Sequence, residues 1–161
     1  MIYIGNFVAV FNTNSMKRLI TTLLTLICAH YLCAQTDSTV FRAHLINKDY
    51  NVYLRIDLHG QAIIVPGQGE LYVRVAGYLG KQNYNYYWPI VTAETHGNKA
   101  MLTLINDYGS EDLTATLTCE NDSTYILKHT GGSTLKMPEK GKWQKLPKVL
   151  VFKRKDKAAR K

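Results

Sequence analysis

The stretch DLTATLTC, residues 112–119, decides the fold of this chain. Apolar residues alternate with threonines along it, so an extended strand points the two sets of side chains to opposite faces. The apolar set is Leu113, Ala115, Leu117 and Cys119. A strand that is apolar on one face and polar on the other is typical of an antiparallel sheet with one face in water.

The same alternation recurs outward from this stretch, at a spacing of about ten residues. In residues 52–58 the set expected to face inward is Val52, Leu54, Ile56 and Leu58, and the set expected to face outward is Tyr53, Arg55 and Asp57. We expect strands over residues 39–46, 51–58, 61–65, 70–79, 86–95, 99–106, 112–119, 123–129, 133–137 and 148–154. Outside the apolar stretch near the start of the chain, no window shows helical periodicity.

The connections between these strands are short and rich in Gly and Asn. HGNK (96–99), ENDS (120–123) and TGGS (130–133) are examples. Both residue types accept the positive φ that two-residue hairpin turns require. Strands joined this way run antiparallel, because parallel strands need long crossovers. Residues 86–137 therefore predict a meander of about five strands.

About eight to ten such strands hide their apolar faces by closing into a barrel or by curling into a sandwich. The predicted fold class is all-β, an antiparallel meander that forms a small barrel or a curled sandwich, and the short turns favour the barrel. Two segments interrupt the pattern. VPGQGE (65–70) is expected to bulge outward, and KMPEKGKWQKLPK (136–148) is expected to be an irregular connection that covers an open end of the barrel.

This architecture loosely resembles small calycin-type barrels. Lipocalin-like families place a Gly-x-Trp motif near the first strand, whereas Gly141-Lys142-Trp143 lies near the last expected strand here. The resemblance therefore transfers no binding residue to this chain.

The start of the chain has the layout of a secretory signal peptide. Met16-Lys17-Arg18 precedes the apolar run 19–27, and Ala34 offers a small residue before the cut. The run is shorter than the roughly 20 residues that span a bilayer. We expect residues 1–15 to be an upstream extension, 16–34 a signal peptide, 35–152 a single β domain and 153–161 a basic tail. An uncleaved anchor, a buried helix and a lipoprotein anchor remain alternatives.

Export is the predicted destination. The Ala34-Gln35 junction resembles exported proteins of anaerobic Gram-negative bacteria, which places the protein in the periplasm, the outer envelope or the medium. Cleavage after Ala34 would leave Cys119 as the one remaining cysteine of three. A single thiol cannot form an internal disulfide, so the core alone must hold the domain together.

The positive charge is concentrated at the end of the chain. Residues 136–161 hold eleven Lys or Arg and two acids, whereas residues 35–135 hold seven Lys or Arg and ten acids. The tail KRKDKAARK is expected to be solvated. An anionic surface of the envelope or a glycan is a possible partner for this basic C-terminus, and export argues against nucleic acid.

Aromatic residues gather in QNYNYYWP (82–89). In a strand that starts near Tyr86, alternation points Trp88 and Ile90 inward with Tyr86 and leaves Tyr87 on the other face. The rings suit core packing or contact with a ligand. If a ligand site exists, the residues expected to line it are Tyr84, Tyr87, Trp88 and Trp143.

Catalytic and metal chemistry find little support in the sequence. NDYGSED (106–112) invites a hydrolase hypothesis with Asp107 and either Glu111 or Asp112, yet neighbours on a strand point apart and Asp107 is expected to cap its own turn. In the expected mature chain the histidines are His44, His59, His96 and His129, and none has metal-motif spacing. Cys119 is expected to be a buried thiol. We predict no catalytic residue, no metal and no cofactor.

The function expected from the sequence is that of an exported, non-enzymatic barrel that binds a glycan, a peptide or an envelope component through aromatic residues at its mouth. A small hydrolase that uses the acidic loop is one alternative. A structural or inhibitory protein-interaction domain is the other, and it would present an exposed apolar patch or a protruding loop instead of a pocket.

Overall fold

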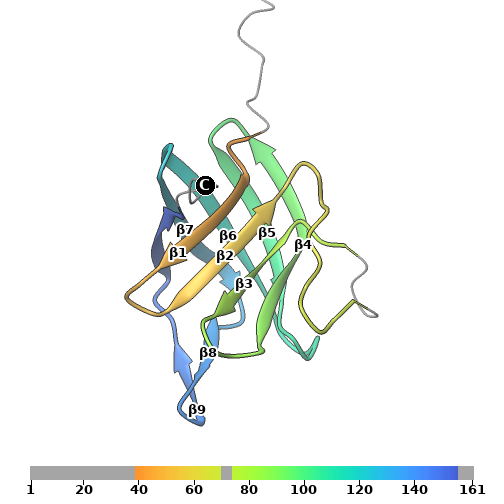
Figure 1. Cartoon of the computed structure of the whole chain (residues 1–161), viewed down its shortest axis with the longest axis vertical. Helices are drawn as coiled ribbons and strands as arrows, with labels where there is room; N and C mark the ends of the chain where they lie inside the picture. The colour runs from red at the N-terminus through yellow and green to blue at the C-terminus, as the bar shows by residue number, and fades with distance from the viewer. Residues whose placement is uncertain (1–38, 70–73, 156–161) are drawn as a thin grey trace, which may run out of the picture. The chain divides into compact units, whose positions relative to one another are not determined.

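Eight antiparallel strands close into a barrel in the computed structural model, which describes residues 39–69 and 74–155 (Figure 1). The strands are β1 (Arg42–Asn47), β2 (Val52–Asp57), β3 (Gly77–Lys81), β4 (Tyr87–His96), β5 (Lys99–Ile105), β6 (Asp112–Asn121), β7 (Thr124–Gly132), β8 (Lys136–Glu139), β9 (Lys142–Lys145) and β10 (Val149–Arg154). The described ranges contain no helix. The predicted all-β antiparallel fold is confirmed.

Closure of the sheet decides between the two architectures that the sequence left open. Strands β1 to β7 form a meander in which each pairs with the next, and β10 then lies between β7 and β1. Leu45 pairs with Arg154 and Ile46 with Lys153, which joins the first strand to the last. The fold is therefore a barrel, with β8 and β9 as a separate two-stranded sheet.

The barrel interior holds the side chains that alternation placed there. Leu113, Ala115 and Leu117 of β6 are buried, while Cys119 is only partly buried at the end of the strand. The inward set of β2 is buried as well. Large side chains fill the remaining space; fully buried are Trp88, Tyr125, Phe41 and Phe152. A barrel of about eight strands is just wide enough for side chains to fill it.

Two expected strands between β2 and β3 are wrong in extent. Residues 61–65 contribute a single bridge, Ile63 to Val75, and the strand expected over 70–79 is reduced to β3, with 70–73 outside the described residues. Pro66 cannot donate to a ladder, and Gly67 has φ 75°, so the chain turns here and Gln68 N donates to Val65 O at 3.2 Å.

The expected meander over residues 86–137 contains four barrel strands instead of five. Its last member, β8, leaves the barrel and pairs with β9, in a segment whose sequence pattern predicts an irregular connection. Lys140 and Gly141 both have positive φ, 49° and 76°, and this pair makes the tight hairpin turn. Pro138 is tolerated in β8 because a two-stranded sheet has free edges.

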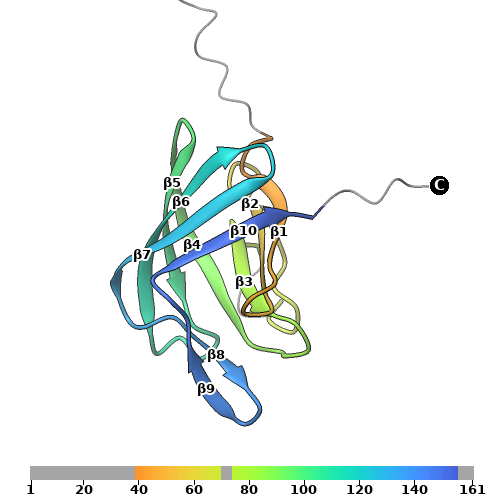
Figure 2. The ribbon, with the colours of Figure 1, turned by 90° about the vertical axis from the view of Figure 1, so that its left-hand side faces the viewer.

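The β8–β9 hairpin lies at one end of the barrel, at the bottom of Figures 1 and 2. Leu135, Met137 and Leu146 are buried in the same core cluster as the barrel interior. This arrangement agrees with the expectation that the segment covers an open end.

Several expectations concern residues outside the described ranges. These are the extension 1–15, the signal peptide 16–34 and the part of the basic tail after Lys155. Within the described ranges, no helix has the length and apolar character needed to cross a membrane.

Candidate functional site

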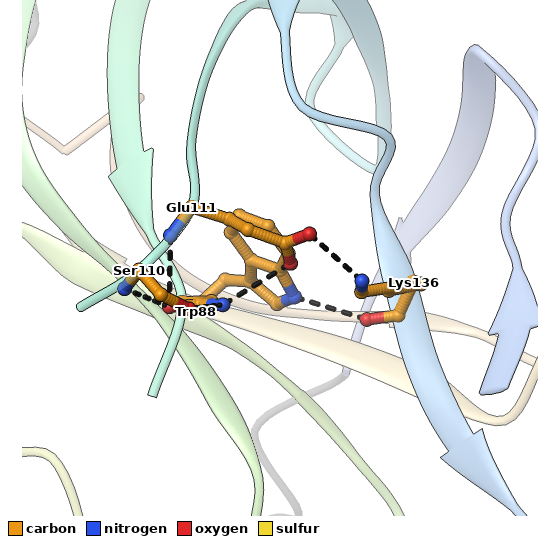
Figure 3. Close-up of polar contacts among 5 residues, drawn as sticks. Trp88, Ser110, Glu111 and Lys136 are labelled. Atoms are coloured by element: carbon orange, nitrogen blue, oxygen red, sulfur yellow. Dashed lines mark hydrogen bonds and ion pairs between the residues drawn. The ribbon is translucent and has the colours of Figure 1, made fainter. Parts of the chain in front are cut away.

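The four predicted site residues lie in different environments. Trp88 points into the barrel, is 0% exposed and donates from Nε1 to the carbonyl of Lys136 at 3.0 Å (Figure 3). Tyr87 points to the outer side of the same strand. Trp143 lies on β9 and is 49% exposed. Tyr84 lies in the β3–β4 turn. The structure therefore brings only Tyr84 and Tyr87 to a common surface.

That surface carries a row of rings on the outer side of β1 to β4, which we call the aromatic wall. Its members are His44, Tyr53, Tyr78 and Tyr87, one from each strand. Consecutive rings meet edge to face with centroids 5.8, 6.0 and 5.2 Å apart. Edge-to-face contacts at such distances are favourable because the positive edge of one ring meets the negative face of the next.

A glycine makes room for this row. Tyr53 and Tyr87 both pair with Gly80 of β3, and the ring of Tyr53 lies over the glycine. A Cβ on Gly80 would stand 2.7 Å from Cζ of Tyr53, closer than any real contact. An aromatic ring over a strand glycine supplies packing that the glycine itself lacks.

The long connection between β2 and β3 covers part of the aromatic wall. Val65 and Val75 pack against Tyr78 and Tyr87 in a hydrophobic cluster separate from the barrel core. Tyr87 is consequently 5% exposed, although it points away from the interior. A loop therefore covers most of the Tyr87 ring, which is one of the four residues predicted to line a ligand site.

Beside the covered rings, the aromatic wall borders an open groove of about 520 Å³. The groove is lined by His44, Tyr53, Arg55, Tyr78, Lys81, Gln82, Asn83, Tyr84, Asn85, Tyr87 and Lys155. The lining thus combines tyrosine rings, three amides and four basic residues. It includes no carboxylate among the residues that the structure describes.

The basic character extends beyond this groove. A neighbouring hollow of about 490 Å³ shares His44, Arg55 and Lys155 with it and adds Arg42 and Arg154. One carboxylate, Asp57, lines this second hollow, and it faces Nε of Arg42 at 3.5 Å. The outer side of β1 and β2 is therefore a positively charged strip next to tyrosine rings.

His44 responds to this surrounding charge. Burial lowers the pKa of its imidazole, and the positive charges of Lys155 and Arg55 lower that pKa further. Its Nε2 is buried and has no hydrogen-bond partner among the described residues. Burial and both positive charges thus favour the neutral imidazole, at the edge of a groove where a bound anion would favour its protonation.

Tyr84 connects the groove to the β8–β9 hairpin. Its hydroxyl accepts a hydrogen bond from Lys140 N at 2.8 Å, and Nζ of Lys81 lies 5.8 Å from its ring centre. Lys81 itself is 2% exposed; its ammonium donates to Gln144 at 2.7 Å and pairs with Glu139 at 2.6 Å. Paired charge explains how a lysine tolerates burial.

The acidic loop between β5 and β6 is held by structural contacts. Oδ1 of Asn106 accepts from the backbone of Ser110 at 2.9 Å, so Asn106 caps the turn where Asp107 was expected to do so. Glu111 pairs with Lys136 at 2.8 Å, as Figure 3 shows, and Asp107 accepts a hydrogen bond from Gln68. The two carboxylates of the hydrolase hypothesis therefore serve different structural partners.

A second outer surface differs from the aromatic wall. Its outward residues come from β4 to β7 and are mostly threonines, so we call it the threonine wall: Thr92, Thr103, Thr114, Thr116 and Thr130. They line a hollow of about 420 Å³, in which the hydroxyls of Thr130 and Thr114 lie 3.0 Å apart. Met101, 53% exposed, is the large apolar side chain of this wall.

The thiol of Cys119 donates to the carbonyl of Asn121 at 3.2 Å. In residues 39–69 and 74–155, no group of three His, Cys, Asp or Glu side chains is placed to hold a metal ion.

Of the residues that line the groove, the sequence predicts only Tyr84 and Tyr87 as site residues, although strand alternation gives the direction of others. Tyr53 and Arg55 belong to the outward set of residues 51–58, so their direction was foreseen. Tyr78 and His44, which line the groove together with Tyr53 and Arg55, lie on other strands. No spacing in the sequence predicts that these four residues meet.

Comparison of the chain with family models, with curated proteins and with solved structures gave no match. The likeness to calycin-type barrels therefore stays a prediction, and the function is argued from the groove itself.

Proposed function

We propose that this chain is an exported, non-enzymatic binding module that holds an acidic glycan in the groove of about 520 Å³ beside the aromatic wall. One observation carries the proposal: tyrosine rings, amides and basic groups converge in one groove whose described lining lacks a carboxylate.

The tyrosines and amides suit a sugar. Tyr53 and Tyr84 are half-buried, so part of each ring faces the groove, and the apolar face of a sugar ring packs well against such surfaces. Asn83 and Asn85 are exposed, and each amide offers both a donor and an acceptor to sugar hydroxyls.

The basic groups select for negative charge. Arg55 and Lys155 are exposed at the groove, and Arg42 extends the positive strip along β1. Arginine binds carboxylates and sulfates through two parallel hydrogen bonds, which makes uronic acid or sulfated sugars the favoured class. Lys155 belongs to the basic tail 153–161, which would add attraction toward an anionic surface of the envelope.

The outer groove is a better candidate than the barrel interior. Trp88 and Phe152, both 0% exposed, occupy the interior together with Tyr125. Protein interiors filled in this way are packed about as densely as organic crystals and contain few voids. A ligand that entered would have to displace these side chains.

Calorimetry with the folded chain tests the proposal. An oligogalacturonide should bind, whereas the uncharged galactose oligomer of equal length should bind much more weakly. Arg55→Gln should weaken binding of the acidic oligomer about tenfold or more, since hydrogen bonds to charged groups contribute about 1.5–3 kcal/mol.

Lys128→Gln on the far side of the barrel removes the same charge from an exposed strand position and should leave the affinity almost unchanged. Equal affinity for the charged and uncharged oligomers, or an equal loss in both variants, would refute the proposal.

A further inference from the structure

The β8–β9 hairpin, residues 136–145, which we call the tip, presents a tryptophan among lysines. Trp143 is 49% exposed, and Lys140, Lys142 and Lys145 are exposed around it. Figures 1 and 2 both show the hairpin projecting from one end of the barrel. An exposed indole that lies close to another exposed ring can form part of an interaction surface.

Further aromatic rings flank Trp143. The Trp143 ring meets Tyr86 with centroids 5.0 Å apart, and Tyr86 meets Tyr108 at 5.8 Å. Tyr108 is 74% exposed, so an indole and a phenol reach solvent on either side of a buried tyrosine. Nζ of Lys136 lies 5.6 Å from the centre of the Trp143 ring.

Contacts with the barrel hold the hairpin in place. Lys81 pairs with Glu139 at 2.6 Å and donates to Gln144 at 2.7 Å, and the Tyr84 hydroxyl accepts from Lys140 N at 2.8 Å. The presented surface is therefore preorganised, which reduces the entropy that docking would cost.

Ion pairs neutralise the carboxylate of the hairpin and the carboxylate beside it. Glu139 pairs with the buried Lys81, and Glu111 pairs with Lys136. Lys140, Lys142 and Lys145 have no ion-pair partner among the described residues. The tip thus combines amphipathic rings with unbalanced positive charge.

We propose that this tip docks on the surface of an anionic phospholipid bilayer. Trp143 and Tyr108 would enter the headgroup region, where tryptophan and tyrosine rings are preferred, and the three lysines would meet lipid phosphates. A soluble polyanion would bind through the lysine charges alone. A bilayer would in addition stabilise the exposed rings in its headgroup region, which favours the bilayer as the partner. This docking surface is separate from the groove at the aromatic wall and does not depend on the glycan proposal.

Fluorescence with lipid vesicles tests the docking. Residues 35–161 contain every described strand, and a β-sheet circular dichroism spectrum with cooperative unfolding would show that this form folds. The chain has two tryptophans, and Trp88 is fully buried, so a change in emission reports on Trp143. Phosphatidylcholine vesicles that contain phosphatidylglycerol should shift the emission to the blue, and brominated lipid should quench it.

Variants separate the contributions. Changing Lys140, Lys142 and Lys145 together to Gln should weaken binding to the anionic vesicles about 100-fold, at about fivefold for each lysine. Trp143→Ala should weaken it as well and abolish the spectral shift. A matched triple variant at exposed positions elsewhere, Lys99, Lys128 and Lys153 to Gln, should bind almost like the parent.

Three results would overturn the proposal. They are equal losses in the two triple variants, binding without a change in Trp143 emission, and a soluble polyanion such as dextran sulfate that binds as tightly as the vesicles. The last result would identify the tip as a site for polyanions in solution.

Discussion

The aromatic wall and the threonine wall both follow from period-two alternation, but they differ in how far water reaches their side chains. Both consist of outward-pointing residues on period-two strands of one barrel. On the first wall Tyr78 and Tyr87 are 2% and 5% exposed, whereas on the second Thr114 is exposed and Thr116 partly so. Alternation therefore decides which face of the sheet a side chain takes, and it does not decide whether water reaches that side chain.

The connections account for the difference. The β2–β3 connection is long enough to place Val65 and Val75 over the tyrosines, which form a hydrophobic cluster of their own. The β4–β5 connection is the tight turn at Gly97-Asn98, with no residues to spare for a cover. The first wall thus carries a covered tyrosine cluster beside an open, basic groove, whereas the second is a hollow lined mostly by hydroxyls.

The largest expected effect comes from removing a covered ring. Tyr78→Ala deletes a ring that is 2% exposed and contacts both Tyr53 and Tyr87, so the free energy of unfolding should fall by about 3–5 kcal/mol. Thr116→Ala on the threonine wall should change it by less than about 0.5 kcal/mol. Urea unfolding followed by circular dichroism measures both. Similar losses in the two variants would mean that the outer cluster contributes no more than the open surface.

A smaller effect on stability is expected from replacing one glycine on each wall with alanine. Gly80→Ala brings a Cβ to 2.7 Å from Cζ of Tyr53 and should destabilise the barrel by about 1–3 kcal/mol, as overpacking usually does. Gly131→Ala on the threonine wall meets only the Thr114 hydroxyl, at 3.1 Å, and should cost less than about 1 kcal/mol. Thermal unfolding ranks the two variants, and the reverse order would contradict the packing of Tyr53 over Gly80.

The smallest effect is a pH dependence that belongs to the aromatic wall. The folded state lowers the pKa of His44 below its ordinary value of 6.5, so the unfolded chain takes up the proton more readily. The contribution of the neutral imidazole to stability is complete above pH 6.5 and declines as the pH falls toward the folded-state pKa. Replacing Arg55 and Lys155 with Gln should raise that pKa, because both charges disfavour protonation.

An NMR titration of the His44 ring protons measures this pKa directly. A value at or above 6.5 in the parent, or no rise in the double variant, would contradict the assigned cause. Binding of an acidic glycan should strengthen as the pH falls through this pKa, since the imidazolium adds positive charge to the groove.

The sequence by itself determined the all-β class, the inner and outer faces of β2 and β6, and the opposite directions of Tyr87 and Trp88. Each of these follows from a local property, because a period of two and a tight turn act within one strand or one hairpin. The aromatic cluster at 82–89 is visible for the same reason, and two of its aromatic residues, Tyr84 and Tyr87, line the candidate groove.

Only the tertiary structure decided the rest. Pairing of β1 with β10 closed the barrel, and pairing of β8 with β9 turned an apparently irregular segment into a hairpin that carries Trp143. Four strands brought His44, Tyr53, Tyr78 and Tyr87 into one row. Such contacts join residues far apart in the chain, and their free energy depends on which surfaces meet, which no local pattern records.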